Sequence, residues 1–131
     1  MNKMTAKEYF TKKYKSSKYH NKKTYVDNIK FDSIKEANFY KELKLREVAR
    51  EVKDIKLQPK FVLQESFIWE GKVERAIIYR ADFMYFDIIL NKHVVVDVKG
   101  MKTEIYKIKR KLFLLNLIRS SDYQCLFREV Y

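Results

Sequence analysis

Glycine, proline, cysteine and histidine are all scarce in this sequence of 131 residues, and the shortages exclude several kinds of chemistry. Two glycines, Gly71 and Gly100, cannot build a Walker phosphate loop or a dinucleotide-binding fingerprint, which excludes NTP-driven and NAD-dependent reactions. The single cysteine, Cys125, forbids an intrachain disulfide, and with only His20 and His93 the usual Cys/His zinc spacings cannot be built. Any bound metal is therefore expected to sit on oxygen ligands.

Long apolar runs are missing as well. No uninterrupted run approaches the roughly 20 residues of a membrane-spanning helix, and residues 1–8 lack the apolar centre of a secretory signal. We therefore expect no membrane partner and a cytoplasmic location. The length suits one compact domain, and a hydrophobic content of 47% with 15% aromatic residues is enough to fill its core.

Positive charge is the most pronounced feature that is present. The 29 Lys and Arg residues against 17 Asp and Glu give a net charge of +12, which favours a polyanionic partner, nucleic acid first. Residues 1–23 hold eight lysines against one acid, Glu8. Two interpretations of this segment are equally supported. It is either an arm that binds along the phosphate backbone, or a solvated or partly helical tail whose aromatic residues dock on a domain of residues 24–131. The arm lysines assigned to DNA are Lys12, Lys13, Lys22 and Lys23.

Turn residues and hydrophobic spacing predict the first elements after the arm. A hairpin is expected over residues 24–31, around Asp27 and Asn28, which tolerate positive φ. A helix follows, because Ser33 and Glu36 match the capping-box spacing. Its apolar positions recur at roughly helical spacing as far as residue 55: Ile34, Ala37, Tyr40, Leu43, Val48, Val52 and Ile55.

Strands are predicted through the middle of the chain. Residues 57–63 are expected to form one strand, with Pro59 at an edge or bulge. Residues 67–69 lead into a turn at Gly71, and their aromatic side chains are assigned to core packing in preference to base stacking. Further strands are expected over residues 76–86, 94–99 and 123–130, with a turn at residues 91–92 that makes the first two neighbours.

The last predicted helix begins at Thr103 and runs to about Asn116. Its apolar face is expected to hold Ile105, Ile108, Leu112 and Leu115. The other face is expected to be basic, and two interpretations stay open for it, phosphate binding and simple solvation. The basic residues concerned are Lys102, Lys107, Lys109, Arg110 and Lys111.

Two acids inside apolar strands are the candidates for chemistry. Asp97 and Lys99 end the run that begins at Val94, and their spacing of two places both on one strand face. Buried charges are costly unless paired or bound to metal, so the two residues form either a salt bridge or a site. Asp82 lies in the neighbouring predicted strand, and a turn centred near residues 89 and 90 would place it opposite Asp97, whereas one centred near Asn91 would offset them.

Two carboxylates on adjacent strands suit Mg²⁺, or Mn²⁺ in its place, which keeps waters and also binds substrate phosphate. A nearby lysine offsets charge that develops on phosphorus, so Asp82, Asp97 and Lys99 together favour metal-dependent phosphodiester hydrolysis. Glu36 taken alone is best explained as part of the helix cap, and with the other acids it gains a role as a further metal or metal-water ligand.

Five segments resemble the phage-associated nuclease-like family known as domain of unknown function 1064, within the PD-(D/E)xK endonuclease superfamily. The resemblance spans nearly everything after the arm. The segments are Asn21–Thr24, Ile29–Ala37, Leu57–Phe61, Tyr79–Phe83 and Asp97–Gly100. Ala81 stands where the superfamily nominally has proline, and Asp97 fills a position often held by Glu.

The resemblance implies an α/β (α+β) fold with a restriction-endonuclease-like core, a mixed central β-sheet flanked by helices. It implies an endodeoxyribonuclease site of Glu36, Asp82, Asp97 and Lys99, with metal held by the acids and the Val98 carbonyl. A phage or mobile element in a bacterial host is the implied source. Holliday or other branched junctions, duplex ends and simple duplex breaks are all compatible substrates, with a junction resolvase preferred.

A rival from another class is a non-catalytic basic DNA-binding protein that acts in phage recombination or replication, whose acids serve only in salt bridges. Charge supports both interpretations equally, and the set of acids with one lysine separates them, since binding alone does not require it. The nuclease is further expected to be a homodimer, because one site cleaves one strand and two nicks are needed to break a duplex or resolve a junction.

Overall fold

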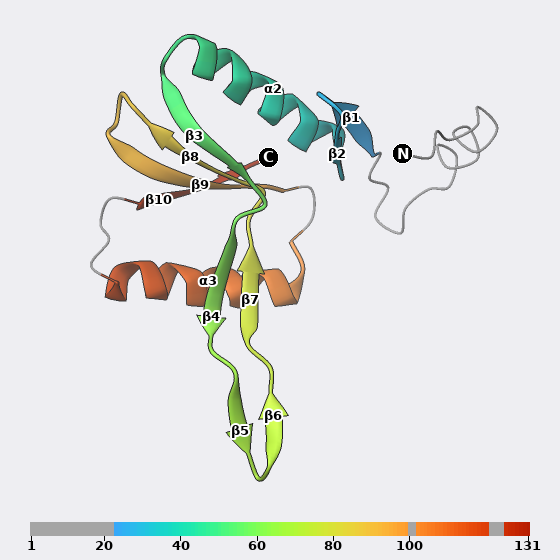
Figure 1. Cartoon of the computed structure of the whole chain (residues 1–131), viewed down its shortest axis with the longest axis vertical. Helices are drawn as coiled ribbons and strands as arrows, with labels where there is room; N and C mark the ends of the chain where they lie inside the picture. Colours follow the sequence, from blue (N-terminus) through green and yellow to red (C-terminus); the bar gives the residue numbers. More distant parts are fainter. Residues whose placement is uncertain (1–22, 100–101, 121–124) are drawn as a thin grey trace, which may run out of the picture. The chain divides into compact units, whose positions relative to one another are not determined.

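The computed structural model describes residues 23–99, 102–120 and 125–131 (Figure 1). By its internal contacts the chain divides into two compact units, Met1–Lys44 and Leu45–Tyr131, which are described separately below. Elements are labelled as in Figure 1. The predicted basic arm lies outside the described residues except for Lys23, which is exposed, so the arm and the single domain after it stay predictions.

The first unit contains the predicted hairpin and the start of the predicted helix. Strands β1 (Thr24–Val26) and β2 (Ile29–Phe31) pair antiparallel, and Asp27 and Asn28 between them take φ values of 51° and 63°, which confirms the hairpin and its turn. Helix α2 (Ile34–Val48) follows. The Ser33 hydroxyl accepts a 3.1 Å bond from the Glu36 N–H, as the capping box predicts.

Helix α2 ends seven residues before the predicted position, at Val48 instead of residue 55. Arg50 takes a φ of 60°, and the N–H groups of Arg50 and Glu51 bond back to the carbonyls of Glu47 and Arg46. This is the Schellman arrangement, which usually has glycine at the left-handed position. With arginine there the sequence gives no stop signal, and the apolar residues assigned to the last turns belong to strand β3 (Val52–Leu57).

The second unit holds a four-stranded mixed sheet in the order β10-β9-β8-β3. Strands β8 (Phe83–Asp87) and β9 (Lys92–Val98) pair antiparallel, as expected, with Asp87 opposite Lys92 and Phe83 opposite Val96. The turn is therefore centred between residues 89 and 90, the first of the two alternatives, and the predicted turn at residues 91–92 is wrong because Lys92 begins β9. Strand β10 (Cys125–Val130) lies parallel to β9, and the first residues of the predicted last strand lie outside the described part.

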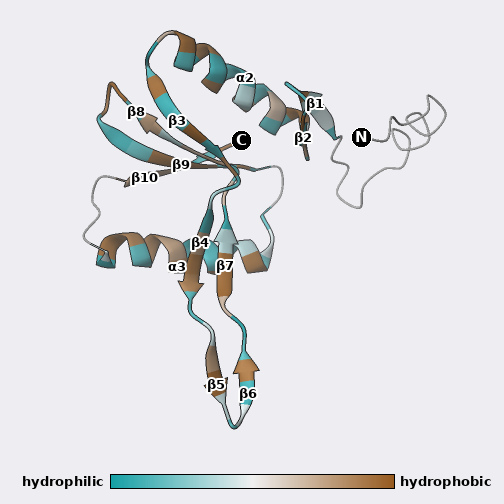
Figure 2. Ribbon diagram, in the orientation of Figure 1, coloured by the Kyte–Doolittle hydropathy of each residue, from teal (hydrophilic) through white to brown (hydrophobic). Residues whose placement is uncertain are grey.

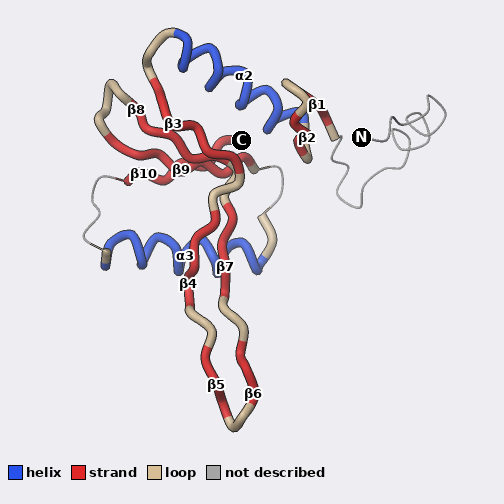
Figure 3. Tube along the Cα trace, viewed as in Figure 1, coloured by secondary structure: helices blue, strands red, loops and turns tan. Residues whose placement is uncertain are grey.

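A two-stranded β-ribbon extends from this sheet. It arises because two of the predicted strands are each interrupted, so that one half of each lies in the sheet and the other half in the ribbon. The expected strand over residues 57–63 is divided at Gln58 and Pro59 into β3 and β4 (Lys60–Gln64), and the expected strand over residues 76–86 is divided at Ala81 and Asp82. Gln58 takes a φ of 49°, and proline has no N–H to continue the ladder. Strand β4 pairs with β7 (Ile77–Arg80), and the ribbon continues into β5 (Phe67–Trp69) and β6 (Lys72–Glu74), as Figures 1 and 3 show.

Helix α3 (Glu104–Arg119) begins as predicted, with Thr103 as N-cap, and runs three residues beyond the expected end. Its buried residues are Tyr106 and Phe113, whereas the predicted apolar face is exposed, so that assignment is wrong. The predicted aliphatic residues and the two aromatic residues both recur at helical spacing. The aromatic residues are the buried ones because they pack in a cluster of rings, in which the ring centroids of Phe113 and Tyr79 are 5.1 Å apart. The described parts of the chain contain no helix that is long and apolar enough to cross a membrane.

The left-handed residue that ends α2 makes a prediction about stability. Arg50→Gly should raise the free energy of unfolding by up to about 1 kcal/mol, because glycine removes the Cβ strain at positive φ and loses part of the gain to unfolded-state entropy. Arg50→Ala is the matched control, since it removes the same side chain and keeps the Cβ. Urea unfolding of the three proteins measures the difference, and equal stabilities of the glycine and alanine variants would contradict the account.

Candidate active site

Asp97 is the most deeply buried acid in the described part of the chain, with 2% of its surface exposed. One carboxylate oxygen accepts a bond from the Tyr79 hydroxyl, and the other lies 2.7 Å from the Lys99 ammonium. The predicted placement of Asp97 and Lys99 on one strand face is therefore confirmed, and so is the ion pair that the structural interpretation required. Tyr79 comes from β7, so this carboxylate joins the β-ribbon to β9.

Asp82 is held beside Asp97 by two hydrogen bonds to main-chain groups of β9, one from its N–H and one to its carboxylate. It lies between β7 and β8, at the point where the chain passes from the ribbon into the four-stranded sheet. Its N–H donates to the Val96 carbonyl at 3.1 Å, and its carboxylate accepts from the Val98 N–H at 2.6 Å. These two bonds flank Asp97 on β9, so the proximity expected for the two acids is confirmed. We refer to Asp82, Asp97 and Lys99 as the acid–lysine cluster.

Lys99 also contacts an aromatic ring, whose hydroxyl is bonded to a third acid. Its ammonium lies 3.6 Å from the centroid of the Tyr106 ring on α3. The Tyr106 hydroxyl donates to Glu129 at 2.9 Å, and Glu129 stands opposite Asp97 in the parallel register of β9 and β10. The lysine is therefore held between a carboxylate and a π-face, an arrangement that stabilises a cation more as its surroundings lose water.

The two tyrosines of this region are neutral donors. Burial, the bond to Asp97 and the negative charge of that carboxylate raise the pKa of Tyr79 far above its ordinary value. Burial and the bond to Glu129 do the same to the pKa of Tyr106. For Glu129, burial alone would raise the pKa, but the bond from Tyr106 and the charges of Arg110 and Lys102 outweigh it and keep the pKa below the ordinary value. Both carboxylates thus keep a protonated phenol as partner.

A second buried acid, Asp87, offers a contrast. One of its oxygens accepts the Leu90 N–H at 2.9 Å and caps the β8–β9 turn, and the other lies 3.2 Å from the Arg46 guanidinium. Asp87 is thus satisfied by turn geometry and by an arginine that also pairs with Glu51 at 3.1 Å. Asp97 differs because its cation is a lysine held against an aromatic ring, and because Asp82 is bonded to the residues on either side of it.

Two predicted metal ligands remain to be placed. Glu36 belongs to the first unit, whose position relative to the second is not determined, so its role as a third acid stays a prediction. Val98, whose carbonyl was predicted as a ligand, uses its N–H to hold Asp82. Within the described residues, no group of three or more His, Cys, Asp or Glu side chains gathers to hold a metal. The acid–lysine cluster therefore supplies two carboxylates.

The basic residues predicted to meet DNA divide into three sets. Lys12, Lys13 and Lys22 lie outside the described residues. Three residues on or next to α3 pair with acids of this chain: Lys102 and Arg110 lie 3.4 and 2.8 Å from Glu129, and Lys107 lies 3.1 Å from Glu104. Those pairs reduce the charge available to phosphate. Lys23 and Lys111 are exposed and Lys109 is half-buried, and binding of DNA by any of these residues stays a prediction.

Sequence reasoning missed Tyr79, Tyr106 and Glu129. Each lies in a different element and is joined to the cluster by tertiary contacts. The one signal in the sequence was that Tyr79 opens the segment Tyr79–Phe83, one of those that carry the resemblance. Nothing local indicated Glu129, because its place opposite Asp97 depends on a parallel crossover through α3.

Comparison with known protein families matches residues 16–129 to the family described as "Protein of unknown function (DUF1064)". The chain therefore belongs to that family. A comparison with curated proteins finds no match. The matched region contains the whole acid–lysine cluster and its aromatic surroundings, and because the family has no assigned function, the chemistry has to be argued from the site.

The bond from Tyr79 to Asp97 predicts a specific loss of stability. Tyr79→Phe should lower the free energy of unfolding by about 1.5–3 kcal/mol, the usual value for a hydrogen bond to a charged group. Tyr106→Phe is the matched control and should cost less, because Glu129 keeps Arg110 and Lys102. In an Asp97→Asn background the Tyr79 effect should shrink, which a double-mutant cycle measures. Equal losses for the two tyrosines, or full additivity with Asp97→Asn, would contradict the assignment.

Proposed function

We propose that this protein is a metal-dependent DNA endonuclease of the PD-(D/E)xK kind, with a restriction-endonuclease-like core. The observation that carries the proposal is the acid–lysine cluster: Asp97 on β9, Asp82 bonded to the residues on either side of it, and an ammonium 2.7 Å from Asp97. The spacing of Asp82, Asp97 and Lys99 and the mixed sheet support it. The net charge of +12 supports a nucleic-acid substrate.

The residues of the cluster fit a hard divalent cation. Mg²⁺ is commonly bound through one or two carboxylates, with waters and substrate phosphate completing its shell, and Mn²⁺ takes the same ligands. Asp82 and Asp97 supply those carboxylates, and in this proposal Glu36 and the Val98 carbonyl are additional ligands. A closed zinc site would need four ligands, and the described residues do not bring even three such side chains together.

Hydrolysis requires that a water oxygen bonds to phosphorus while the bond from phosphorus to one sugar oxygen breaks and that oxygen takes up a proton. A bound divalent cation would lower the pKa of the attacking water and offset negative charge. Lys99 lies where a phosphate near the two carboxylates would meet its ammonium, which stabilises the charge that develops on the phosphate oxygens. Tyr79 fixes the orientation of Asp97, and the Val98 N–H fixes that of Asp82.

Substrate binding is assigned to those of the predicted DNA-binding residues that have no acid as an intramolecular partner. Lys109, Lys111 and Lys23 fit this description within the described ranges, and the arm lysines Lys12, Lys13 and Lys22 are proposed to act with them. Duplex and branched DNA are both compatible, and a branched junction is the preferred substrate. A cleavage panel of junction, flap, duplex, single strand and RNA would distinguish these substrates.

The rival proposal, a basic DNA-binding protein without catalysis, also has an observation in its favour. Both oxygens of Asp97 already have protein partners, so the buried acid is satisfied without a metal. Such a protein, however, gains nothing from a second carboxylate beside the first, because like charges repel each other and both repel phosphate. We therefore place the nuclease first, as a phage or mobile-element enzyme of the host cytoplasm.

Metal dependence is the first test of the proposed function. Cleavage should require Mg²⁺ or Mn²⁺ and disappear in chelator, whereas Ca²⁺ should bind without good turnover. Independently of activity, Mg²⁺ and Ca²⁺ should raise the melting temperature of the protein, because a ligand that binds only the folded state stabilises it. Asp97→Asn should abolish both effects. Full cleavage in excess chelator would refute metal catalysis, and no nucleic-acid cleavage in any metal would favour the rival.

The role of Lys99 is tested by separating folding from rate. Lys99→Ala leaves a buried carboxylate without its cation and should cost about 3 kcal/mol of stability or more. Its folded fraction should also cleave on the order of 10²-fold more slowly. Val52→Ala, which truncates a buried residue on β3, is the control and should lose stability while its folded fraction keeps the normal rate. A normal rate from folded Lys99→Ala would show that the lysine is structural and the site assignment wrong.

A further inference from the structure

The β5–β6 end of the ribbon is apolar and exposed. All six strand residues of this hairpin are exposed, including Ile68 at 72% and Trp69 at 63%. Figure 2 shows the hydrophobic colour of β5 at the far end of the ribbon from the four-stranded sheet. This overturns the prediction that its aromatic residues pack in the core. A two-stranded hairpin is at best marginally stable alone in water, so this one gains from a partner surface.

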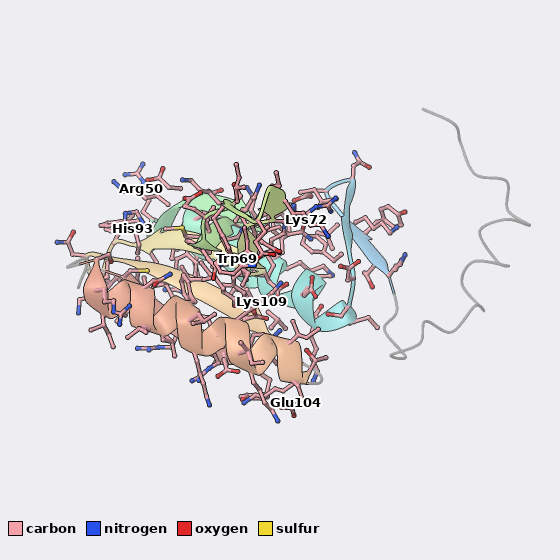
Figure 4. The ribbon with its side chains drawn as sticks, turned by 90° about the horizontal axis from the view of Figure 1, so that it is seen from below. Arg50, Trp69, Lys72, His93, Glu104 and Lys109 are labelled. Atoms are coloured by element: carbon pink, nitrogen blue, oxygen red, sulfur yellow. The ribbon has the colours of Figure 1, made fainter. Side chains whose placement is uncertain are left out.

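Helix α3 carries a second exposed apolar surface in the same unit. Ile105, Ile108, Leu112 and Leu115 are all exposed, the first two at 67% and 60%. Their spacing of three, four and three residues forms one stripe along the helix. The opposite side, with Tyr106 and Phe113, packs on the ribbon and the sheet. We call these four residues the α3 stripe. Glu104, at the start of the helix beside the stripe, points away from the sheet in Figure 4.

The two apolar surfaces have opposite charge. Residues 65–75, which contain the hairpin, hold three glutamates against two basic residues, an excess of one negative charge in a chain of net charge +12. Residues 104–119 of α3 hold five basic residues against one glutamate, an excess of four positive charges. Lys111 lies next to the stripe on the helical wheel, as does Lys107, which is paired with Glu104 at 3.1 Å. Electrostatic attraction therefore adds to apolar burial if hairpin and helix meet.

We propose that the β5–β6 hairpin of one copy of this chain docks on the α3 stripe of a second copy. In a dimer with twofold symmetry the contact occurs twice, hairpin to helix and helix to hairpin. Both apolar surfaces of both chains are then buried, and no surface remains to bind a third chain. Pairing of two α3 stripes is less favourable, because it brings together two helices of like positive charge. A phosphate backbone is a poor occupant of the hairpin, whose own charge is negative.

The dimer contact is independent of the chemistry at Asp97, and it supplies what duplex cleavage would need. Two chains bring two acid–lysine clusters into one particle, so each strand of a duplex or junction meets its own site. The ribbon that carries the hairpin continues directly from the segment that holds Asp82. Dimer contact and cluster thus lie at the two ends of one β-ribbon.

Disulfide trapping tests the contact in the full chain without metal or DNA. In a Cys125→Ala background, one protein carries Ile68→Cys and another carries Ile108→Cys. Mixing them under mild oxidation should give a covalent dimer that contains one chain of each kind, and each protein alone should give much less. Efficient trapping of Ile108→Cys with itself would show a helix-to-helix contact and overturn the proposal, as would no preference for the mixed dimer.

Sedimentation of unmodified protein provides the second measurement. The chain should sediment as a dimer, and Ile68→Asp or Ile108→Asp should shift it to monomer by at least about tenfold in dissociation constant. Ile89→Asp, at an equally exposed position in the β8–β9 turn, is the control and should leave the mass unchanged. A monomeric wild-type chain would overturn the proposal and leave the nuclease proposal standing. Unchanged mass with weakened DNA binding in the Ile68 variant would show that the hairpin contacts DNA instead.

Discussion

The burial of one carboxylate constrains the unit from Leu45 to Tyr131. Taking the charge of Asp97 out of water costs several kcal/mol unless protein groups replace its hydration, so its partners must be in place whenever the unit is folded. Tyr79 brings β7 to the carboxylate, and Lys99 meets it directly after the end of β9. The Tyr106 ring beneath Lys99 then fixes α3 against the same point. Sheet, ribbon and helix are thus joined at a single ionised group.

Turns and helix ends were predicted correctly wherever they are formed by the residue types that usually form them. Asp27 and Asn28 gave the first hairpin, Gly71 the turn of the second, and Thr103 the start of α3. Prediction failed where an unusual residue performs the task, since Arg50 ends α2 in a conformation that glycine normally supplies. The face of α3 failed for another reason: two apolar sets share one helical period, and only the ring cluster of the folded unit selects between them.

The candidate site also has a part that local sequence patterns predicted and a part that depends on the tertiary fold. Strand periodicity placed Asp97 with Lys99, and the position of the turn, left open between two alternatives, decided that Asp82 lies beside them. The groups that enclose the cluster come from β7, α3 and β10, which are far apart in the sequence. Their placement follows from a parallel crossover and from a strand break at Ala81 and Asp82, and the sequence alone does not determine either. The proximity of Asp82, Asp97 and Lys99 was therefore predictable, whereas the groups that surround them were not.

Stability alone is a weak explanation for the acid–lysine cluster. Well-packed apolar residues often serve a fold as well as a buried ion pair does, so the pair of Asp97 and Lys99 is not needed to fill its space. Asp82 strengthens this argument, because the Val98 N–H binds its carboxylate and so holds a second negative charge near that of Asp97. Two carboxylates and one ammonium leave an excess negative charge at a point from which the aromatic cluster partly excludes water. A divalent cation would offset that excess and would then attract the phosphate that the carboxylates on their own repel.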